Sequence, residues 1–592
     1  MPLPASVSSA LLSLSTATPR ALKSYAYGTS GFRGPAHTLD AVCMRMGVLA
    51  ALRSWAIYQA RGEAAAAASV SAASAPAPPR QCPIVGLVVT ASHNAGVDNG
   101  VKLVDASGEM MLQSWEAVAT EVANAAEDAL PRTVEHILER FGLQGVAEAS
   151  FDKSGPPPRV FVARDTRTSS PKLNELVLAG ARALGAEVQD FGLATTPQLH
   201  WVVREANEGR TATLEAYYKQ LNSAFRKALA CKPDAASSSG SSAVQLPPTV
   251  VDCANGVGTH SVGALAPYLK DVLALETRNT NVDDMSGLNE NCGAEHVQKG
   301  RTLPANFSLN GDRGRKCAAL DGDADRLVYF YVSPSGEFRL LDGDKIIALY
   351  TTLLRDLLAA SGLKDVLRLG IVQTAYANGA STLFMQNQLG VPVCFTNTGV
   401  KHLHHRAVEF DIGVYFESNG HGTVVFSHRA HQLINQAVEN TKAQGERAPQ
   451  HLAALCLQSL LDLINQCIGD AVSDLLLVEV ALYHRNWSLS DWDSLYEDLP
   501  SVMLKVLVKD RTVISTTDAE RRCVTPAGLQ DAIDALVAAA PAGSKPGTRR
   551  AFVRPSGTED VVRVYAEAST REEVDKLAAD VCAVTAKLAG GV

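Results

Sequence analysis

A short run of apolar, mostly β-branched residues occupies positions 84–90 and is followed at once by a small, polar, glycine-containing segment, 91–100. The run has the length and composition of a buried strand. The segment after it predicts an exposed loop at the carboxyl end of that strand. In open α/β sheets this edge is where ligands bind, so the loop is the first candidate for a functional site.

The loop opens with three polar side chains, Ser92, His93 and Asn94, and Lys102 follows on a second predicted strand, 101–104. A hydroxyl, several hydrogen-bond donors and a cation can together hold a phosphoryl group. A serine-rich surface turn is the alternative, and for an isolated S-H-N tripeptide it is the better interpretation. The loops further along the chain favour the phosphoryl site.

The length of the chain, 592 residues, exceeds what one hydrophobic core usually supports, so we expect three or four domains. The net charge of −8 argues against nucleic acid as a partner, and no apolar run approaches the roughly 18 residues of a membrane span. The 11 cysteines include no C-x-x-C pair, which predicts reduced thiols. We therefore expect a cytoplasmic protein, a monomer or weak homo-oligomer, whose partners are small molecules. Residues 6–15 favour a short helix over a transit peptide.

Apolar periodicity predicts alternating helices and strands along most of the chain. The expected helices are 41–60, 173–184, 217–230 and 345–359, and the expected strands are 160–163, 187–192, 249–252, 316–320, 327–332, 369–373, 391–395 and 411–416. The strand–helix–strand order over 160–192 predicts a βαβ unit and a parallel sheet.

Several segments do not fit this alternation. Two Ala/Ser-rich tracts, 62–79 and 232–246, predict a mobile loop and a disordered insert. Residues 427–450 are polar and predict irregular structure, whereas 452–483 predict one long helical connector. The loop N-G-V-G (255–258) is not a dinucleotide fingerprint, because the third glycine is missing.

Three aspartates, Asp321, Asp323 and Asp325, alternate with small residues between two predicted strands. Carboxylates this close repel one another unless a cation lies between them, and hard oxygen ligands suit Mg²⁺. An EF-hand is excluded because Arg326 stands where the sixth position requires glycine. A solvated acidic turn is the weaker alternative.

Two later loops also carry polar groups. Glu417, Asn419 and His421 follow a predicted strand in E-S-N-G-H-G. Acids and amides bind sugar hydroxyls, and the histidine in this setting indicates an acid or base rather than a structural side chain.

The last loop is R-P-S-G-T (554–558), followed by Arg563. Two guanidinium groups, two hydroxyls and a glycine-backed run of amides predict a phosphate clamp. A simple β-turn with incidental arginines is the alternative.

In the order and relative placing of these motifs the chain resembles the α-D-phosphohexomutase superfamily. The motifs are G-T-S-G-F-R (28–33), the Ser92 loop, D-G-D-A-D-R (321–326), E-S-N-G-H-G (417–422) and R-P-S-G-T (554–558). Segments 98–105, 372–382, 397–405 and 465–476 resemble the branch that acts on N-acetylglucosamine phosphates rather than those that act on glucose or mannose phosphates.

The resemblance implies an α/β fold with the four-domain architecture of this superfamily: three related α/β domains with mixed sheets and a smaller C-terminal α+β domain around a central cleft. The expected divisions are 1–197 with the phosphoserine loop, 198–303, 304–450 with the metal-binding and sugar-binding loops, a helical connector over 451–486, and 487–592 with the phosphate-binding loop.

The resemblance also implies roles for individual residues. Ser92 resembles the phosphoserine, and one Mg²⁺ would be held by Asp321, Asp323, Asp325 and an oxygen on Ser92. Lys102 and His421 match the general acid and base, and Arg33 and Arg326 match the cations near the transferring phosphate. Substrate binding would involve Thr398, Gly399, Glu417 and Asn419, and the idle phosphate would be held by Arg554, Ser556, Gly557, Thr558 and Arg563.

The implied activity is reversible conversion of N-acetylglucosamine 6-phosphate to the 1-phosphate through a sugar 1,6-bisphosphate, supplying UDP-N-acetylglucosamine synthesis. The same chemistry on glucose or mannose phosphate is one alternative, and a non-catalytic binding protein on the same scaffold is another. Ala95 stands where the superfamily usually has proline, which would leave the serine loop less constrained. Ser30 replaces the usual alanine in the first motif, a minor change.

Overall fold

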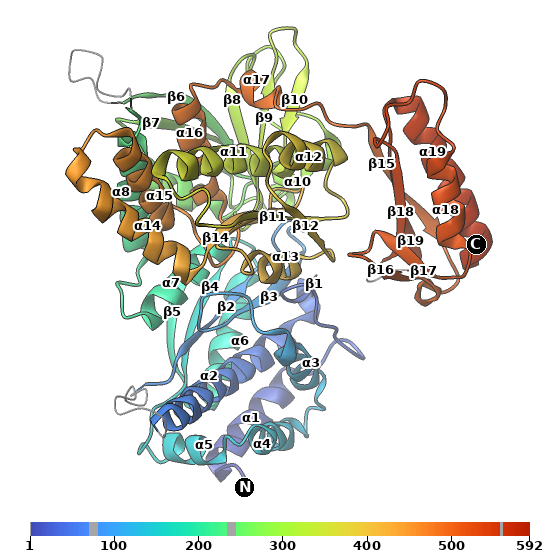
Figure 1. Ribbon diagram of the computed structural model, residues 1–592. Helices are drawn as coiled ribbons and strands as arrows, with labels where there is room; N and C mark the ends of the chain where they lie inside the picture. The colour runs from blue at the N-terminus through green and yellow to red at the C-terminus, as the bar shows by residue number, and fades with distance from the viewer. Residues whose placement is uncertain (1, 70–80, 234–243, 557–559) are drawn as a thin grey trace. The chain divides into compact units, whose positions relative to one another are not determined.

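The computed structural model describes residues 2–69, 81–233, 244–556 and 560–592, and these residues form two compact units. Unit 1 consists of Met1–Arg226, Ser242–Leu340 and Asp462–Leu476. Unit 2 consists of Lys227–Ser241, Leu341–Leu461 and Leu477–Val592. Each unit is therefore built from segments that lie far apart in the sequence (Figure 1).

The first sheet of unit 1 is mixed, with the strand order β1-β3-β2-β4-β5. Its strands are β1 (Gly31–Pro35), β2 (Ile84–Val89), β3 (Asp98–Val104), β4 (Arg159–Arg164) and β5 (Glu187–Leu193). β2, β4 and β5 run parallel, whereas β3 is antiparallel to β1 and β2. The parallel strands confirm the predicted βαβ unit, and β2 is buried along its whole length.

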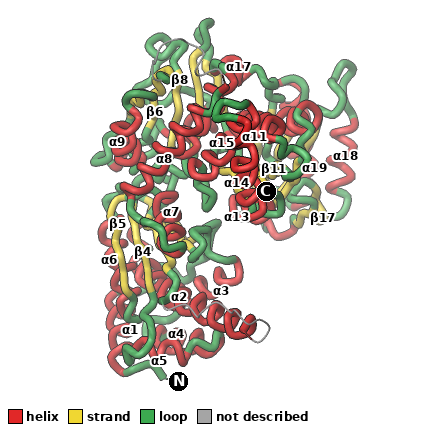
Figure 2. Tube along the Cα trace, turned by 60° about the vertical axis from the view of Figure 1, so that its left-hand side comes forward, coloured by secondary structure: helices red, strands yellow, loops and turns green. Residues whose placement is uncertain are grey.

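Helices cover this sheet. α2 (Asp40–Ser69) and α6 (Ser170–Ala183) pack against each other, and Figure 2 shows α6 beside β4 and β5. Their close approach requires glycine, because a Cβ at Gly180 would lie 1.8 Å from the Met44 carbonyl oxygen. α7 (Thr196–Asn207) packs against β2 and β4. The other helices here are α1 (Ala5–Ala17), α3 (Glu116–Asn124), α4 (Leu130–Arg140) and α5 (Gln144–Phe151).

α2 is longer than the sequence analysis predicts. The helix continues to Ser69, through part of the tract interpreted as a mobile loop, because alanine is the residue most favourable to helix. The rest of that tract, 70–80, lies outside the described residues. Among the described residues, Asp40–Ala64 is the one stretch long and apolar enough to cross a membrane, but 83% of its most apolar window is buried inside the protein.

The second sheet of unit 1 has the order β10-β9-β8-β6-β7. Its strands are β6 (Leu246–Asp252), β7 (Leu273–Arg278), β8 (Lys316–Leu320), β9 (Leu327–Val332) and β10 (Phe338–Leu341), and the helices of this region are α8 (Leu214–Ala230), α9 (Gly258–Leu269) and α10 (Gly293–Gly300). β6 pairs in parallel with both β7 and β8. The predicted division at 303/304 therefore cuts through one sheet, and the metal-binding loop between β8 and β9 belongs with β6. The other predicted boundaries stay predictions.

Unit 2 contains a third mixed sheet, with the order β12-β11-β13-β14. Its strands are β11 (Leu369–Thr374), β12 (Val393–Thr396), β13 (Ile412–Phe416) and β14 (Gly422–Phe426), and the nearby helices are α11 (Gly343–Ser361), α12 (Gly379–Leu383) and α13 (Val400–Ala407). β11 is parallel to β12 and β13, and β14 returns antiparallel to β13. The three sheets thus share one design, in which parallel strands meet an antiparallel edge.

Two helical expectations were wrong. The polar segment 427–450 forms α14 (His428–Thr441), because Ser427 caps the helix and Ile434 and Val438 are buried on one face. The predicted connector over 452–483 is two helices, α15 (Pro449–Leu463) and α16 (Ala471–Arg485). Most of the second predicted insert, 234–243, lies outside the described residues.

The C-terminal part of unit 2 is an antiparallel sheet, β15-β19-β18, packed against two helices. Its elements are β15 (Ser501–Leu507), β18 (Arg550–Pro555), β19 (Val561–Glu567), α18 (Leu529–Ala538) and α19 (Arg571–Ala589), with α17 (Leu489–Asp493) before them. A hairpin, β16 (Ser515–Thr517) and β17 (Arg522–Thr525), is inserted between β15 and α18. Three mixed α/β sheets and this α+β part confirm the predicted fold class.

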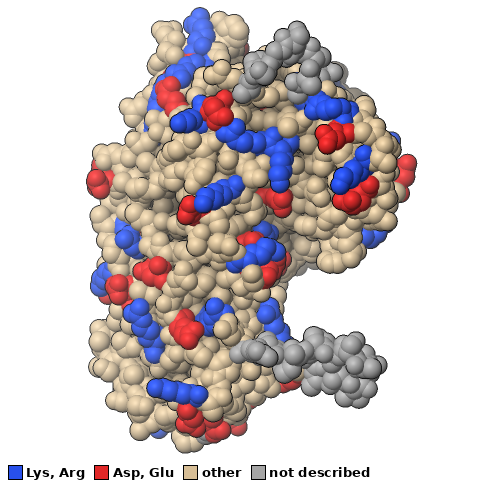
Figure 3. All heavy atoms as spheres, turned by 90° about the vertical axis from the view of Figure 1, so that its left-hand side faces the viewer, with Lys and Arg blue, Asp and Glu red and all other residues tan. Residues whose placement is uncertain are grey.

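Charged side chains of both signs are interspersed on the face drawn in Figure 3. The described residues also include solvent-accessible ion pairs, such as Arg226 with Asp271 and Lys172 with Asp40. The described part of this face therefore carries no broad cationic patch, and a phosphorylated ligand would have to bind at a local cluster of cations.

Candidate active site

Ser92 lies in the loop after β2, and its hydroxyl faces an aspartate of the second sheet. Ser92 Oγ donates to Asp321 Oδ2 at 2.7 Å. The backbone at Ser92 has a φ of 51°, a left-handed conformation that costs a residue with a side chain about 1 kcal/mol. The tip of the loop is exposed as predicted, with Val97 78% exposed, but Ser92 itself is only 4% exposed. The covering loop comes close because Gly322 has no Cβ; one there would lie 2.5 Å from the Ser92 carbonyl oxygen.

Asp321, Asp323 and Asp325 follow β8, and all three are buried. One ligand atom from each lies within 4.8 Å of the others. Burial, together with the charges of Asp325 and Asp323, raises the pKa of Asp321 well above its usual value. A cluster of this kind is held together by cations.

Lys102 supplies one such cation. Its Nζ lies 2.7 Å from Asp323 Oδ2 and 2.6 Å from Asp325 Oδ2. Burial lowers the pKa of Lys102, but the two carboxylates outweigh burial and the pKa is raised. Thr196 Oγ1 also donates to Asp323 Oδ2, at 2.6 Å. The structure therefore places the predicted proton-transfer residue Lys102 directly on the predicted metal-binding cluster.

The donor set fits Mg²⁺. Asp323 Oδ1 is buried and has no hydrogen-bond partner among the described residues, which is expected of an oxygen reserved for a metal. Three carboxylates at this spacing offer the hard oxygen ligands that Mg²⁺ prefers. The chemistry and geometry of the residues present thus agree with the predicted metal.

Arg33 and Arg326 complete the group of predicted residues in unit 1. Arg33 donates to Asn94 Oδ1 at 2.9 Å, and Arg326 donates to Glu295 Oε2 at 2.8 Å. Burial and the charge of Arg326 lower the pKa of Arg33, so these two cations are electrostatically coupled. Burial is the largest cause and the positive charge of Arg326 the next, and together with Arg33 they lower the pKa of His93 to about 2. Two coupled arginines beside a serine hydroxyl suit a dianionic phosphate.

Two residues that the sequence analysis missed hold the serine loop in place. The buried Arg167 guanidinium pairs with Asp165 and donates to the carbonyl oxygens of Ser92, at 3.2 Å, and Asn94, at 2.6 Å. Asn289 donates to the same two oxygens at 3.0 Å each. Arg167 could have been found from its place in R-D-T-R (164–167). This motif follows a predicted strand that runs parallel to the strand before Ser92. No comparable pattern marks Asn289.

Replacing Arg167 with methionine is expected to lower the free energy of unfolding by about 3 kcal/mol, because the buried Asp165 carboxylate loses its cation. Chemical denaturation measures the change. The matched control is Lys172→Met, which breaks an exposed ion pair with Asp40 and is expected to cost less than about 1 kcal/mol. Equal losses in the two variants would contradict the role given to Arg167.

The predicted sugar-binding residues lie in the turn between β13 and β14 of unit 2. Asn419 Nδ2 donates to Glu417 Oε2 at 3.3 Å, and Asn419 Oδ1 accepts from the backbone N–H of His421 at 2.9 Å. His421 is only 5% exposed. The structure brings these three predicted residues together in one compact turn.

Asp344, which the sequence analysis did not single out, fixes this turn. Its Oδ2 accepts from Ser418 Oγ at 3.0 Å and from the backbone N–H of Asn378 at 2.9 Å. Burial raises the pKa of Asp344 to about 7. Asp344 therefore changes its charge close to neutral pH while supporting a predicted substrate-binding loop.

Because the pKa of Asp344 is raised in the folded state, unfolding releases a proton between about pH 4 and about pH 7. The contribution of Asp344 to stability thus falls as pH rises through this window and is constant above it. The difference in melting temperature between Asp344→Asn and the parent should shift in favour of the variant as the pH rises from about 5 to about 7.5, because only the parent loses stability. The exposed control Asp531→Asn should show no such trend, and a pH-independent difference for Asp344→Asn would refute this account.

The predicted phosphate clamp forms a row of cations in the C-terminal sheet. Arg554 on β18 is the cross-strand partner of Arg563 on β19, which in turn is the partner of Lys505 on β15. Directly opposed like charges destabilise a sheet unless an anion lies between them, so the row indicates an anion site. Ser556 is buried next to it, whereas Gly557 and Thr558 lie outside the described residues.

Thr398 and Gly399 precede α13. Gly399 has a φ of 123°, a conformation that favours glycine. Thr398 donates through both its backbone N–H, at 3.0 Å, and its hydroxyl to Glu520 Oε2. Glu520 was not a predicted site residue, and nothing in its local sequence marks it.

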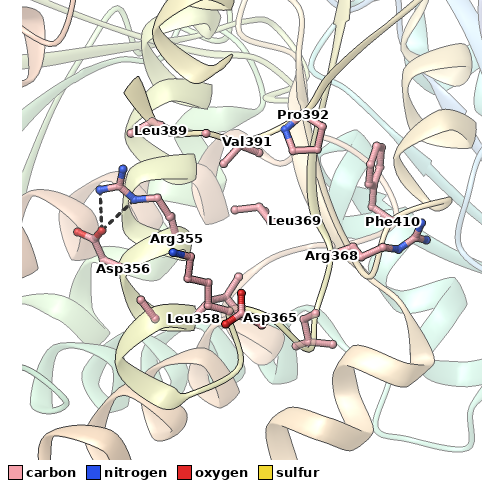
Figure 4. A pocket seen from close by; sticks show the side chains of 14 residues that line it. Arg355, Asp356, Leu358, Asp365, Arg368, Leu369, Leu389, Val391, Pro392 and Phe410 are labelled. Atoms are coloured by element: carbon pink, nitrogen blue, oxygen red, sulfur yellow. Dashed lines mark hydrogen bonds and ion pairs between the residues drawn. The ribbon is translucent and has the colours of Figure 1, made fainter. Parts of the chain in front are cut away.

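A separate pocket of about 690 Å³ lies beside α11 and β11 in unit 2 (Figure 4). Its lining combines apolar side chains, including Leu369, Val391 and Phe410, with the ion pair of Arg355 and Asp356. None of the predicted site residues lines this pocket, and nothing in the structure indicates what it binds.

The three mixed α/β sheets and the antiparallel α+β part are the fold expected of an α-D-phosphohexomutase, and the hydrogen bond from Ser92 to a buried aspartate cluster agrees with that class. Comparison with known families narrows this class. The family description "Phosphoacetylglucosamine mutase AMG1, domain III" matches residues 342–487. Descriptions of phosphoglucomutase/phosphomannomutase domain I and of the C-terminal domain match 135–216 and 524–584.

The chain belongs to the phosphoacetylglucosamine mutase family. It is 44% identical to the human phosphoacetylglucosamine mutase over 96% of this chain and 94% of the relative, and 43% identical to the Arabidopsis thaliana protein of the same name over 95% of each. The Aspergillus fumigatus N-acetylphosphoglucosamine mutase, solved as a crystal structure in complex with GlcNAc-6P and magnesium, is 38% identical in sequence to this chain. The two structures align with a TM-score of 0.85 over 99% of this chain and all of the fungal chain. These likenesses confirm the predicted family and fold.

Proposed function

We propose that this protein interconverts N-acetylglucosamine 6-phosphate and N-acetylglucosamine 1-phosphate through a phosphoserine at position 92 and a 1,6-bisphosphate intermediate. The observation that carries the proposal is the hydrogen bond from Ser92 Oγ to Asp321 within a cluster of three buried aspartates. The named activity of the relatives supports it, as does the fungal relative solved with GlcNAc-6P and magnesium.

Ser92 carries the group that is transferred. The oxygen of the free sugar hydroxyl forms a bond to the phosphorus as the Ser92 oxygen–phosphorus bond breaks, and the hydroxyl proton passes to a base. In the second half-reaction the other phosphate of the bisphosphate returns to Ser92. Arg33 and Arg326 balance the charge on the equatorial phosphoryl oxygens, which is most of what catalysis of this transfer requires.

Asp321, Asp323 and Asp325 would hold Mg²⁺, together with an oxygen of phosphorylated Ser92. When bound, Mg²⁺ neutralises charge on the transferring phosphoryl oxygens. Lys102 bridges Asp323 and Asp325 and holds their carboxylates close together.

The residues of unit 2 recognise the rest of the substrate. Glu417 and Asn419 accept hydrogen bonds from sugar hydroxyls and donate hydrogen bonds to them. His421 of unit 2 and Lys102 of unit 1 exchange protons with the reacting hydroxyls. The idle phosphate binds to the clamp, which consists of Arg554, Ser556, Gly557, Thr558 and Arg563. Thr398 and Gly399 bind substrate beside it. One clamp must accept the phosphate on either end of the sugar, a demand that several independent donors meet better than a single rigid pair.

We place the enzyme in the cytoplasm, because all 11 cysteines are free thiols and most are buried. Its oligomeric state is proposed to be a monomer or weak homo-oligomer, with sugar phosphates as its partners.

Substrate choice tests the proposal. We expect kcat/KM for N-acetylglucosamine 6-phosphate to exceed that for glucose or mannose 6-phosphate by about 10-fold or more, because a pocket built for an extra group loses binding energy without it. A coupled assay of each 1-phosphate product measures this. Equal or better use of glucose 6-phosphate would instead make the protein a glucose-type mutase, and no turnover of any of them would favour a binding protein.

A further inference from the structure

Glu520 contacts both a predicted substrate-binding residue and the predicted phosphate clamp. Its Oε2 accepts from the backbone N–H and the hydroxyl of Thr398, and its Oε1 lies 3.3 Å from Arg554 Nε. The side chains of Glu520 and Arg554 are 15% and 17% exposed, so this ion pair is largely removed from solvent. One carboxylate thus joins a proposed substrate-binding residue to the proposed phosphate clamp.

The backbone around Glu520 is unusual. Asp518, Ala519 and Glu520, in the turn between β16 and β17, have successive φ values of 52°, 55° and 66°. Three consecutive non-glycine residues in the left-handed region are strained and persist only where surrounding contacts hold them. One such contact is the Arg521 guanidinium, which stacks 4.1 Å from the centre of the Phe395 ring. The turn is therefore shaped to bring Glu520 to its two partners.

The negative charge of Glu520 offsets the repulsion among the cations of the clamp. Arg554 is opposed across the sheet by Arg563, and Arg563 by Lys505. In the absence of ligand, a row of like charges is stabilised by a nearby anion, and Glu520 is the carboxylate paired with its first member. A sugar phosphate that binds the clamp would bring a second anion to the same guanidinium.

We propose that Glu520 is a positioning residue that competes with the idle phosphate for Arg554. In the free enzyme it neutralises Arg554 and holds the Thr398 loop; when phosphate binds, the guanidinium exchanges one anion for another. The same exchange eases release, because Arg554 is never left as a bare, largely buried cation. Such easing matters for a bisphosphate that must leave the clamp and return in the opposite orientation. This inference rests on the clamp assigned under the proposed function.

Calorimetric titration with inorganic phosphate, which avoids the sugar and the transfer step, tests this competition directly. We expect Glu520→Gln to bind phosphate about two- to fivefold more tightly than the parent, the effect of removing a competing ion pair of moderate strength. Glu520→Asp keeps the charge but withdraws it by one methylene group, so it is expected to fall between the two. Glu572→Gln, an exposed residue with the same change of charge, controls for long-range electrostatics and should leave the affinity unchanged.

Arg554→Ala separates failure of this inference from failure of the clamp. Weaker phosphate binding by Arg554→Ala, together with tighter binding by Glu520→Gln, supports both. If Arg554→Ala weakens binding while Glu520→Gln and Glu520→Asp bind as the parent or more weakly, the clamp stands and Glu520 is merely structural. Unchanged binding by Arg554→Ala would overturn the clamp and the competition together. In sugar-phosphate turnover, Glu520→Gln should lower both KM and kcat, a combination that a simple loss of structure does not produce.

Discussion

Replacing Ser92 with alanine is expected to abolish mutase turnover, with a loss of at least about 10⁴-fold, because the phosphoryl group then has no covalent carrier. The loss should fall on kcat, whereas binding of N-acetylglucosamine 6-phosphate should change little. The reason is that Ser92 supplies one hydroxyl to the site, and Arg33, Arg326 and the clamp remain. A coupled assay for turnover and calorimetry for binding separate the two effects.

Ser107→Ala is a suitable control for this variant. Ser107 is exposed and lies beyond the end of β3, outside the group of residues around Ser92. The control should retain parental turnover and stability. Substantial turnover by Ser92→Ala would contradict a phosphoserine mechanism even if the rest of the site were correct.

Replacing Asp323 with asparagine is expected to raise the Kd for Mg²⁺ by at least about 10-fold and to reduce turnover in parallel. Asp323 Oδ1 is a buried oxygen with no hydrogen-bond partner among the described residues, and the variant offers the metal a weaker, uncharged ligand. In the parent, a chelator should remove activity and added Mg²⁺ should restore it. Calorimetric titration with Mg²⁺ gives the affinity independently of turnover.

The exposed Asp152 provides the matched control, because Asp152→Asn makes the same change of charge in the same unit. It should bind Mg²⁺ as the parent does. Parental Mg²⁺ affinity in Asp323→Asn would show that the aspartate cluster is not the metal site.

The sequence analysis singled out residues that the structure brings together, such as Ser92 with Asp321 and Lys102 with Asp323, but it did not predict their surroundings. Motifs such as D-G-D-A-D-R act through residues a few positions apart, so their chemistry can be read locally. The burial of Ser92 could not be predicted in this way, because the groups that cover and hold its loop, Gly322, Asn289 and Arg167, come from distant parts of the sequence. Contacts of this kind leave no periodic signal.

The errors in the fold have a similar origin. The division at 303/304 failed because β8 pairs with β6 across a long intervening segment, and pairing between distant strands is not encoded in either strand alone. α14 was missed because the many polar residues of 427–450 obscured an apolar stripe at helical spacing, which Ala430, Ile434, Ala437 and Val438 form in the structure. Composition predicted a mobile loop over 62–79, whereas the helical propensity of alanine extends α2 as far as Ser69.

The central claim is that Ser92 carries the phosphoryl group. Its most direct test is the mass of the Ser92 peptide from purified enzyme, measured after incubation with a sugar 1,6-bisphosphate and again after addition of N-acetylglucosamine 6-phosphate. The mechanism predicts a single added phosphate on that peptide that is lost when the 6-phosphate is added. A Ser92 peptide that never carries phosphate, in an enzyme that nevertheless turns over, would contradict it.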